Sequence, residues 1–185
     1  STSPTHPLTH SYIVTTHAPT LGDVVAGILA SLGPAHDPFG PGSERVQSSV
    51  LRPSQGAWFA QRRESLLGAI GWHAELPDAA ARLDAFWAGL VDAPPSDKHH
   101  LETMISCVAV GFGDLLRPFG FEWRIVCDEW GTGLGMVALP GTADVLVVPD
   151  SFVGKRWEDR VRTFVEDVLP SLQAHVEKAK AAWLH

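Results

Sequence analysis

Two carboxylates and three glycines lie close together in the second half of the chain, where they could support two kinds of chemistry. Asp128 and Glu129 are adjacent, and the glycines follow at alternate positions, Gly131, Gly133 and Gly135. A carboxylate can act as a general acid or base, and closely spaced glycines can hold a phosphate. A dinucleotide-binding loop, however, has the pattern G-x-G-x-x-G and opens a helix. Here the spacing is G-T-G-L-G, and the following residues, MVALPGTADVLVVP, are typical of strands. We therefore predict a hairpin turn and a strand with close backbone approach.

Strand alternation limits what the two carboxylates can do. In the run EWRIVCDEW, Trp123, Ile125 and Cys127 fall on one face of the expected strand. Asp128 and Glu129 point to opposite faces, so they cannot both act in one site. We expect Asp128, beside the turn, to accept hydrogen bonds from backbone amides, and contact with a ligand is the alternative.

A second group of charged residues follows the last expected strand. Lys155, Arg156 and Arg160 could hold a phosphate or a carboxylate on an otherwise acidic protein. The alternative is structural: Arg156 would pair with a carboxylate and fasten the terminal helix to the sheet, with Asp128, Glu158 and Asp159 as the candidates.

Other catalytic and metal-binding patterns are missing from the sequence. The nine histidines show no metal-ligand spacing, and there is no G-x-S-x-G nucleophile motif. Asp150 or Ser151 is expected to cap a helix. Cys107 and Cys127 are expected to be small buried hydrophobic residues, although a disulfide between them is an alternative. We therefore predict neither a metal site nor a cofactor.

Charge and hydropathy indicate the class of partner and compartment. The net charge of −7 and the pI of about 5.6 argue against nucleic acid and favour a basic partner protein. The sequence has no apolar run long enough to span a membrane and no recognisable signal peptide. Because cysteine is scarce, we expect a reducing, cytoplasmic location.

These residues must be positioned by a mixture of helices and strands. A loop rich in proline and glycine at residues 34–42 divides an N-terminal extension, 1–45, with one helix, from a single α+β domain, 46–185. We predict helices on a three- to four-stranded antiparallel meander, ending in a long helix that Pro170 interrupts. The expected helices cover residues 21–32, 55–71 with Ser54 as cap, 77–91, 98–117 with a cap at Ser96 or Asp97, and 156–183. The expected strands cover 122–130, 134–139 and 143–149.

The tryptophans divide into two groups. Four have neighbours that suggest core packing: Trp58, Trp87, Trp123 and Trp157. Trp130 at the turn and Trp183 near the end of the last helix are harder to bury, and we expect them to be exposed interface anchors.

Four short motifs, in order, carry a resemblance to a known family. They are AWFAQRRESL, VAVGFGDLLRPFGFEW, W-x-x-x-x-D-x-x-G over residues 123–131, and P-x-x-x-x-x-K-R-W-E over residues 149–158. Over about residues 50–160 the chain resembles a bacterial family catalogued only as a domain of unknown function (number 3806 in that series). The resemblance implies a stand-alone bacterial α+β protein and brings no catalytic residue or cofactor with it.

Three functions fit the sequence. The first is a bacterial protein-interaction module that binds a basic partner through Asp128, Glu129 and Trp130. An immunity or inhibitor protein is its most concrete form. The second is a small-molecule-binding or hydrolytic enzyme with Asp128, Lys155 and Arg156 at its site. The third is a structural or assembly subunit that uses its N-terminal extension.

Overall fold

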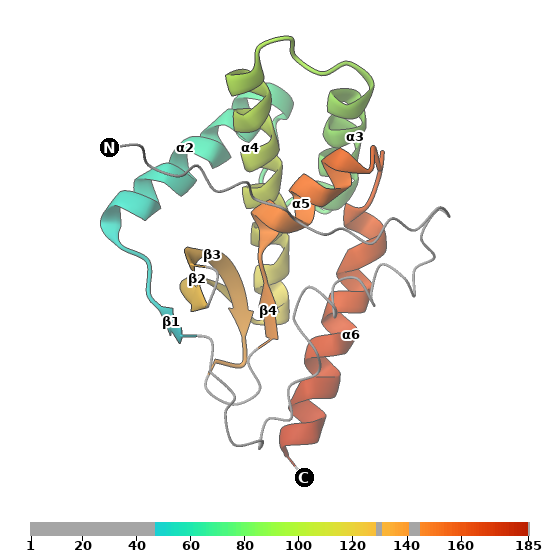
Figure 1. Cartoon of the computed structure of the whole chain (residues 1–185). Coiled ribbons are helices and arrows are strands. Elements are labelled where there is room, and N and C mark those ends of the chain that lie inside the picture. The colour runs from blue at the N-terminus through green and yellow to red at the C-terminus, as the bar shows by residue number, and fades with distance from the viewer. Residues whose placement is uncertain (1–46, 129–130, 141–144, 185) are drawn as a thin grey trace, which may run out of the picture.

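The computed structural model describes residues 47–128, 131–140 and 145–184, without the side chains of Gln47 and Asp128. The chain folds as an α+β protein, as predicted (Figure 1). Its elements, in order, are β1 (Gln47–Ser49), α2 (Pro53–Ile70), α3 (Ala79–Asp92), α4 (Lys98–Leu116), the 3-10 turn η1 (Arg117–Phe119), β2 (Phe121–Asp128), β3 (Gly131–Ala138), β4 (Val145–Val147), α5 (Pro149–Glu158) and α6 (Val165–Trp183). The expected N-terminal extension and its helix lie outside the described residues.

The strands form one antiparallel sheet in the order β1-β2-β3-β4, which confirms the predicted meander. Strands β2 and β3 pair from Phe121 opposite Ala138 to Asp128 opposite Gly131. The short strand β1 pairs with the outer edge of β2 and supplies the fourth strand.

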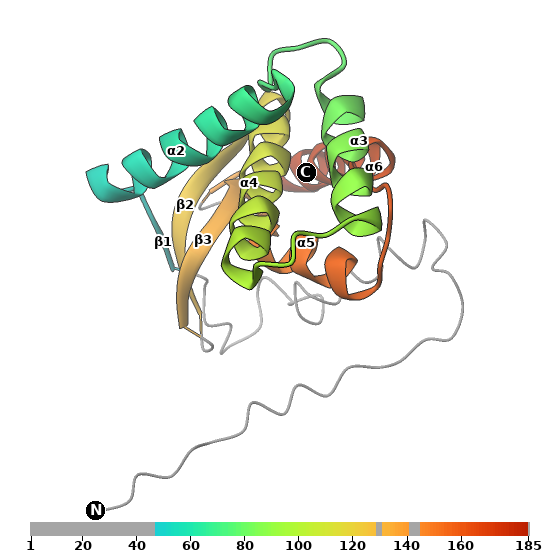
Figure 2. The same ribbon diagram turned by 90° about the horizontal axis from the view of Figure 1, so that it is seen from above.

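One face of this sheet carries the core. Phe121, Ile125 and Met136 are buried on that face, and α2 and α4 lie over it (Figure 2). In β3, Gly135 lies close to side chains of the neighbouring strands, and no close approach of backbone is found there: a Cβ atom at Gly135 would lie 2.8 Å from Leu146 Cδ1 and 3.1 Å from Val126 Cγ2. A side chain at this position would require the Leu146 and Val126 side chains to shift.

Helix α4 occupies the centre of the molecule. It packs against α2, α3 and α5, and every residue from Cys107 to Leu116 is buried. Its start confirms the predicted cap: the Asp97 carboxylate accepts a hydrogen bond of 2.8 Å from the His100 backbone N–H. A helix buried on several sides needs small residues where its neighbours come close, and Gly111 and Gly113 are two such positions.

The predicted long C-terminal helix is present as α6, but its predicted start at residue 156 and its predicted interruption at Pro170 are wrong. Two helices, α5 and α6, are separated by residues 159–164, and Pro170 lies inside α6 without ending it. The cause of the break lies far away in the sequence. Asp84, on α3, is 5% exposed, and its two carboxylate oxygens accept hydrogen bonds of 2.7 to 3.0 Å from the backbone N–H groups of Phe164, Val165 and Glu166. This carboxylate satisfies the first amides of α6 and is favoured by the positive end of the helix dipole.

Two predicted caps were also wrong. Helix α2 begins at Pro53 with Arg52 as its N-cap, so Ser54 lies inside the first turn. Helix α5 begins at Pro149, and neither Asp150 nor Ser151 caps it with a side-chain hydrogen bond. In both helices a proline, whose φ angle is fixed, occupies the first helical position, and the residues predicted to cap the helix come after it.

The aromatic core agrees in part with the prediction. Trp87 is fully buried, and its Nε1 donates a 2.7 Å hydrogen bond to the Val161 carbonyl, whereas Trp58, Trp123 and Trp157 are only half-buried. The sequence did not single out Trp72, which is equally buried and bonds to the Ala79 carbonyl. Within the described ranges, no helix is both long enough and apolar enough to cross a membrane.

Candidate functional site

The hairpin that the sequence favoured as a site is described only up to its edge. Asp128 ends β2, and its backbone pairs with that of Gly131. Glu129 and Trp130 lie outside the described residues, as does the side chain of Asp128. Trp183 is 62% exposed near the end of α6, as expected.

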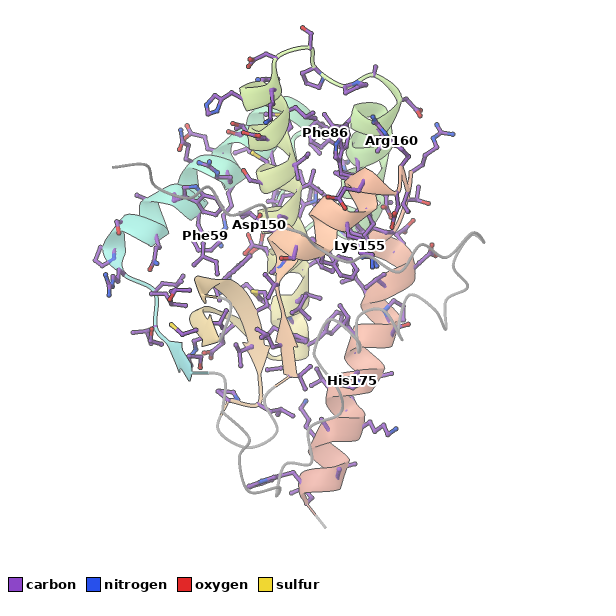
Figure 3. All side chains as sticks on the ribbon, viewed as in Figure 1. Phe59, Phe86, Asp150, Lys155, Arg160 and His175 are labelled. Atoms are coloured by element: carbon purple, nitrogen blue, oxygen red, sulfur yellow. The ribbon has the colours of Figure 1, made fainter. Side chains whose placement is uncertain are left out.

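The cationic group lies on α5, but at the opposite end from the one predicted. Lys155 and Arg156 occupy the last turn of α5, and Arg160 follows in the turn that leads to α6. Figure 3 shows Asp150 at the beginning of α5 and Lys155 and Arg160 toward its far end. Lys155 is exposed, and Arg156 is half-buried.

Arg156 stacks on aromatic rings and pairs with no carboxylate among the described side chains, which do not include that of Asp128. Its guanidinium carbon lies 3.5 Å from the centre of the Phe152 ring and 5.9 Å from that of Phe164. One nitrogen, Nη1, donates a 3.2 Å hydrogen bond to the Phe152 carbonyl. The expected ion pairs with Glu158 or Asp159 are not formed in the described part of the chain.

Burial and charge oppose each other at this position. Removal from water lowers the pKa of Arg156 to about 10, and the nearby Asp159 offsets that effect only in part. The group stays charged at neutral pH, in surroundings that disfavour its charge.

Arg160 also stacks, with its guanidinium carbon 4.6 Å from the centre of the Trp157 ring. Its backbone has a φ angle of 53°, in the left-handed region that side chains other than glycine rarely adopt. The turn therefore holds Arg160 in an uncommon conformation directly after α5.

A separate arginine, Arg63, has a structural role and pairs with a buried carboxylate. Arg63, on α2, donates hydrogen bonds of 2.6 and 2.7 Å to the two carboxylate oxygens of Asp114 on α4, and Trp123 Nε1 donates a third of 3.0 Å. The hydrogen bonds to Asp114 raise the pKa of Arg63. Because Asp114 is only 4% exposed and accepts all three bonds, this cluster joins α2, α4 and β2 and has little capacity left for a ligand.

The sequence did not reveal a groove between α3 and the beginning of α4. It has a volume of about 430 Å³ and is open to solvent. Most of its lining is apolar: Ala85, Phe86, Gly89, Leu90, Ala93, Pro95, His100 and Met104. Phe86 and Leu90 recur at helical spacing, which by itself indicates only a face packed on the core. The groove arises because the neighbouring positions are small residues, Ala85, Gly89 and Ala93.

The two cysteines and the possible metal ligands of the described residues complete the account of the site. No group of three or more histidine, cysteine or acidic side chains in this part of the chain could hold a metal. Both cysteines are free thiols; Cys107 is buried as expected, whereas Cys127 is only half-buried, with its Sγ 3.2 Å from Thr132 Oγ1. Burial raises the pKa of the Cys107 thiol, which keeps it in its unreactive form.

Comparison with known proteins adds no assignment: no family model, no curated protein and no solved structure matches the chain. The resemblance to the bacterial domain of unknown function stays a prediction that rests on the four motifs.

Proposed function

We propose that this protein is a protein-interaction module that binds a basic partner and receives an apolar side chain of that partner between α3 and α4. The observation that carries the proposal is the groove itself. Its lining is mostly apolar, it is open to solvent, and its volume of about 430 Å³ can hold a large side chain. Burial of an aromatic or aliphatic anchor in such a groove is the usual source of binding energy at protein interfaces.

Charge supports the choice of partner. The chain carries a formal net charge of −7, which attracts a basic protein and repels nucleic acid. A small acidic protein that neutralises a basic effector, as bacterial immunity proteins and inhibitors do, is the most concrete form of this function. Asp128, Glu129 and Trp130 are the proposed second contact, at the hairpin.

A glycine in the groove provides a direct test. A Cβ atom at Gly89 would meet no other atom within 4 Å, so Gly89→Leu would place a side chain in open space and occupy the groove without a clash. Gly68→Leu is the matched control, because Gly68 is also exposed on a helix, α2, and also has open space around it. The full chain would first be used to capture a stoichiometric partner from the host lysate.

The dissociation constant of that partner would then be measured for both variants. We expect Gly89→Leu to weaken binding at least about tenfold, since the anchor loses its place, and Gly68→Leu to bind as the parent does. Equal binding by all three proteins, or an acidic partner, would overturn the proposal. Trp130→Ala with Glu129→Lys tests the hairpin contact in the same assay.

A further inference from the structure

We propose that Arg156, with Lys155 beside it, forms a binding site for an oxyanion, either a carboxylate or a phosphate group of a ligand. This site lies on α5, apart from the groove between α3 and α4, and the inference does not depend on the proposed partner binding.

The hydrogen-bonding capacity of Arg156 is the first reason. A guanidinium has five N–H donors in one plane, and this one uses a single donor, on the Phe152 carbonyl. The Phe152 ring covers one face of the group and leaves the in-plane donors unused. Within the described residues, no side-chain acceptor bonds to them. Two parallel N–H groups of this kind match the two oxygens of a carboxylate or a phosphate.

The contrast with Arg63 is the second reason. Both arginines are removed in part from water and both contact a phenylalanine ring, Arg63 at 5.4 Å from the Phe59 centre. Arg63 receives a bidentate carboxylate from Asp114. Arg156 receives no carboxylate from the residues that the structure describes, and burial lowers its pKa. An anion bound at Arg156 would supply the compensation that Asp114 gives to Arg63.

The position of the Arg156 guanidinium also argues against a simple interaction with the dipole of α5. Basic side chains in the last turn of a helix often interact with its free carbonyl groups. The guanidinium of Arg156 instead turns back by one helical turn, to the ring and carbonyl of Phe152. Lys155 is exposed beside it and has no ion pair in the described part of the chain, so its ammonium group is available to attract the same anion.

NMR of the isolated full chain can test this site. The Nε–Hε signals of ¹⁵N-labelled arginines would be followed while inorganic phosphate, and separately acetate, is added at constant ionic strength. The signal that disappears in Arg156→Met belongs to Arg156. We expect that signal to move saturably with at least one anion, and the Arg82 signal, from an arginine already paired with Asp78, to stay in place.

The outcomes separate the two ligand types. Saturation with phosphate alone indicates a phosphorylated ligand, and saturation with acetate alone indicates a carboxylate ligand. Arg156→Lys keeps the charge but loses the paired donors, so we expect it to bind the active anion at least about tenfold more weakly. Shifts no larger than those caused by sodium chloride would overturn the inference, whatever Gly89→Leu does to partner binding.

Discussion

At the scale of single residues, the two buried carboxylates explain much of the architecture. Asp84 bonds three backbone amides at the start of α6, and Asp114 bonds Arg63 and Trp123. Neither residue stood out in the sequence, because an aspartate within an apolar helical pattern looks the same whether it faces water or a distant helix end. The nearest of the three amides lies 80 residues from Asp84, and Arg63 lies 51 residues from Asp114. Contacts over such separations depend on the folded structure and have no local signal.

Removal of the Asp84 carboxylate should destabilise the folded protein. Asp84→Ala leaves three amides of α6 without an acceptor in a buried place, and we expect the free energy of unfolding to fall by about 3 kcal/mol. Urea denaturation would measure the loss. Asp92→Ala, which removes an exposed partner of Arg162, is the control and should cost less than about 1 kcal/mol. If the two variants are equally stable, Asp84 does not support α6.

The Asp114 cluster should behave as a coupled unit. Asp114→Ala leaves Arg63 and Trp123 without their acceptor, and because Arg63 is partly exposed to water we expect a loss of about 2–3 kcal/mol. Arg63→Met alone also destabilises, because it leaves a buried carboxylate with one partner fewer. The double variant should cost clearly less than the sum of the single ones. Additive losses in this cycle would show that the two residues act independently.

The two thiols should differ in reactivity and in its dependence on pH. The raised pKa of Cys107 means that its thiolate forms only at a more alkaline pH than usual, and its side chain is buried. At pH 8 we expect one rapid thiol reaction per chain, at Cys127, and a second only on unfolding or at higher pH. Cys127→Ser should remove the rapid phase. A rapid phase that persists in this variant would mean that Cys107 is accessible.

At the scale of the elements, the spacing of apolar residues predicted which segments fold but not how they end. The periods of 2 and 3.6 correctly predicted β2, β3 and the three helices α2, α3 and α4. The break between α5 and α6 was misplaced because proline is a local signal, whereas the true boundary is stabilised from α3. Pro170 lies inside α6 and does not end it.

Close packing between α4 and β2 can be tested at Gly113. A Cβ atom there would overlap the ring of Trp123, which is itself held by Asp114. We expect Gly113→Ala to lower the free energy of unfolding by about 1–3 kcal/mol. Gly68→Ala is the contrasting variant: it has open space and should stabilise α2 by about 0.5–1 kcal/mol. Thermal or chemical unfolding would measure the stability of both variants. An unchanged free energy of unfolding in Gly113→Ala would contradict the packing argument.

At the scale of the whole molecule, the candidate sites were only partly foreseeable. The charge pattern pointed to Lys155 and Arg156, but the sequence could not show that Arg156 stacks on Phe152 without a carboxylate partner. The groove was missed because it results from small residues on one helix facing the beginning of another. Such a hollow depends on the distance between two helices, which composition and periodicity do not specify.

The net charge makes the proposed association sensitive to salt. Attraction between the acidic chain and a basic partner acts over a distance that shrinks as ionic strength rises. We expect the association rate constant to fall at least about tenfold between roughly 0.05 M and 0.5 M sodium chloride, with a much smaller change in the dissociation rate. Stopped-flow measurements would show this, and a rate independent of salt would argue against a basic partner.

The link from Asp84 to α6 also has a consequence for the order in which the protein folds during synthesis. Asp84 leaves the ribosome 80 residues before Phe164, so α3 is made long before its partner amides exist. Until they arrive, packing of α3 would bury a carboxylate without hydrogen-bond donors for its charge, and we expect α3 to stay undocked while the helices and strands between α3 and α6 assemble. Protease cutting within α3 of chains stalled before residue 164, but not of released chains, would demonstrate this delay. An early helix would then complete its packing last.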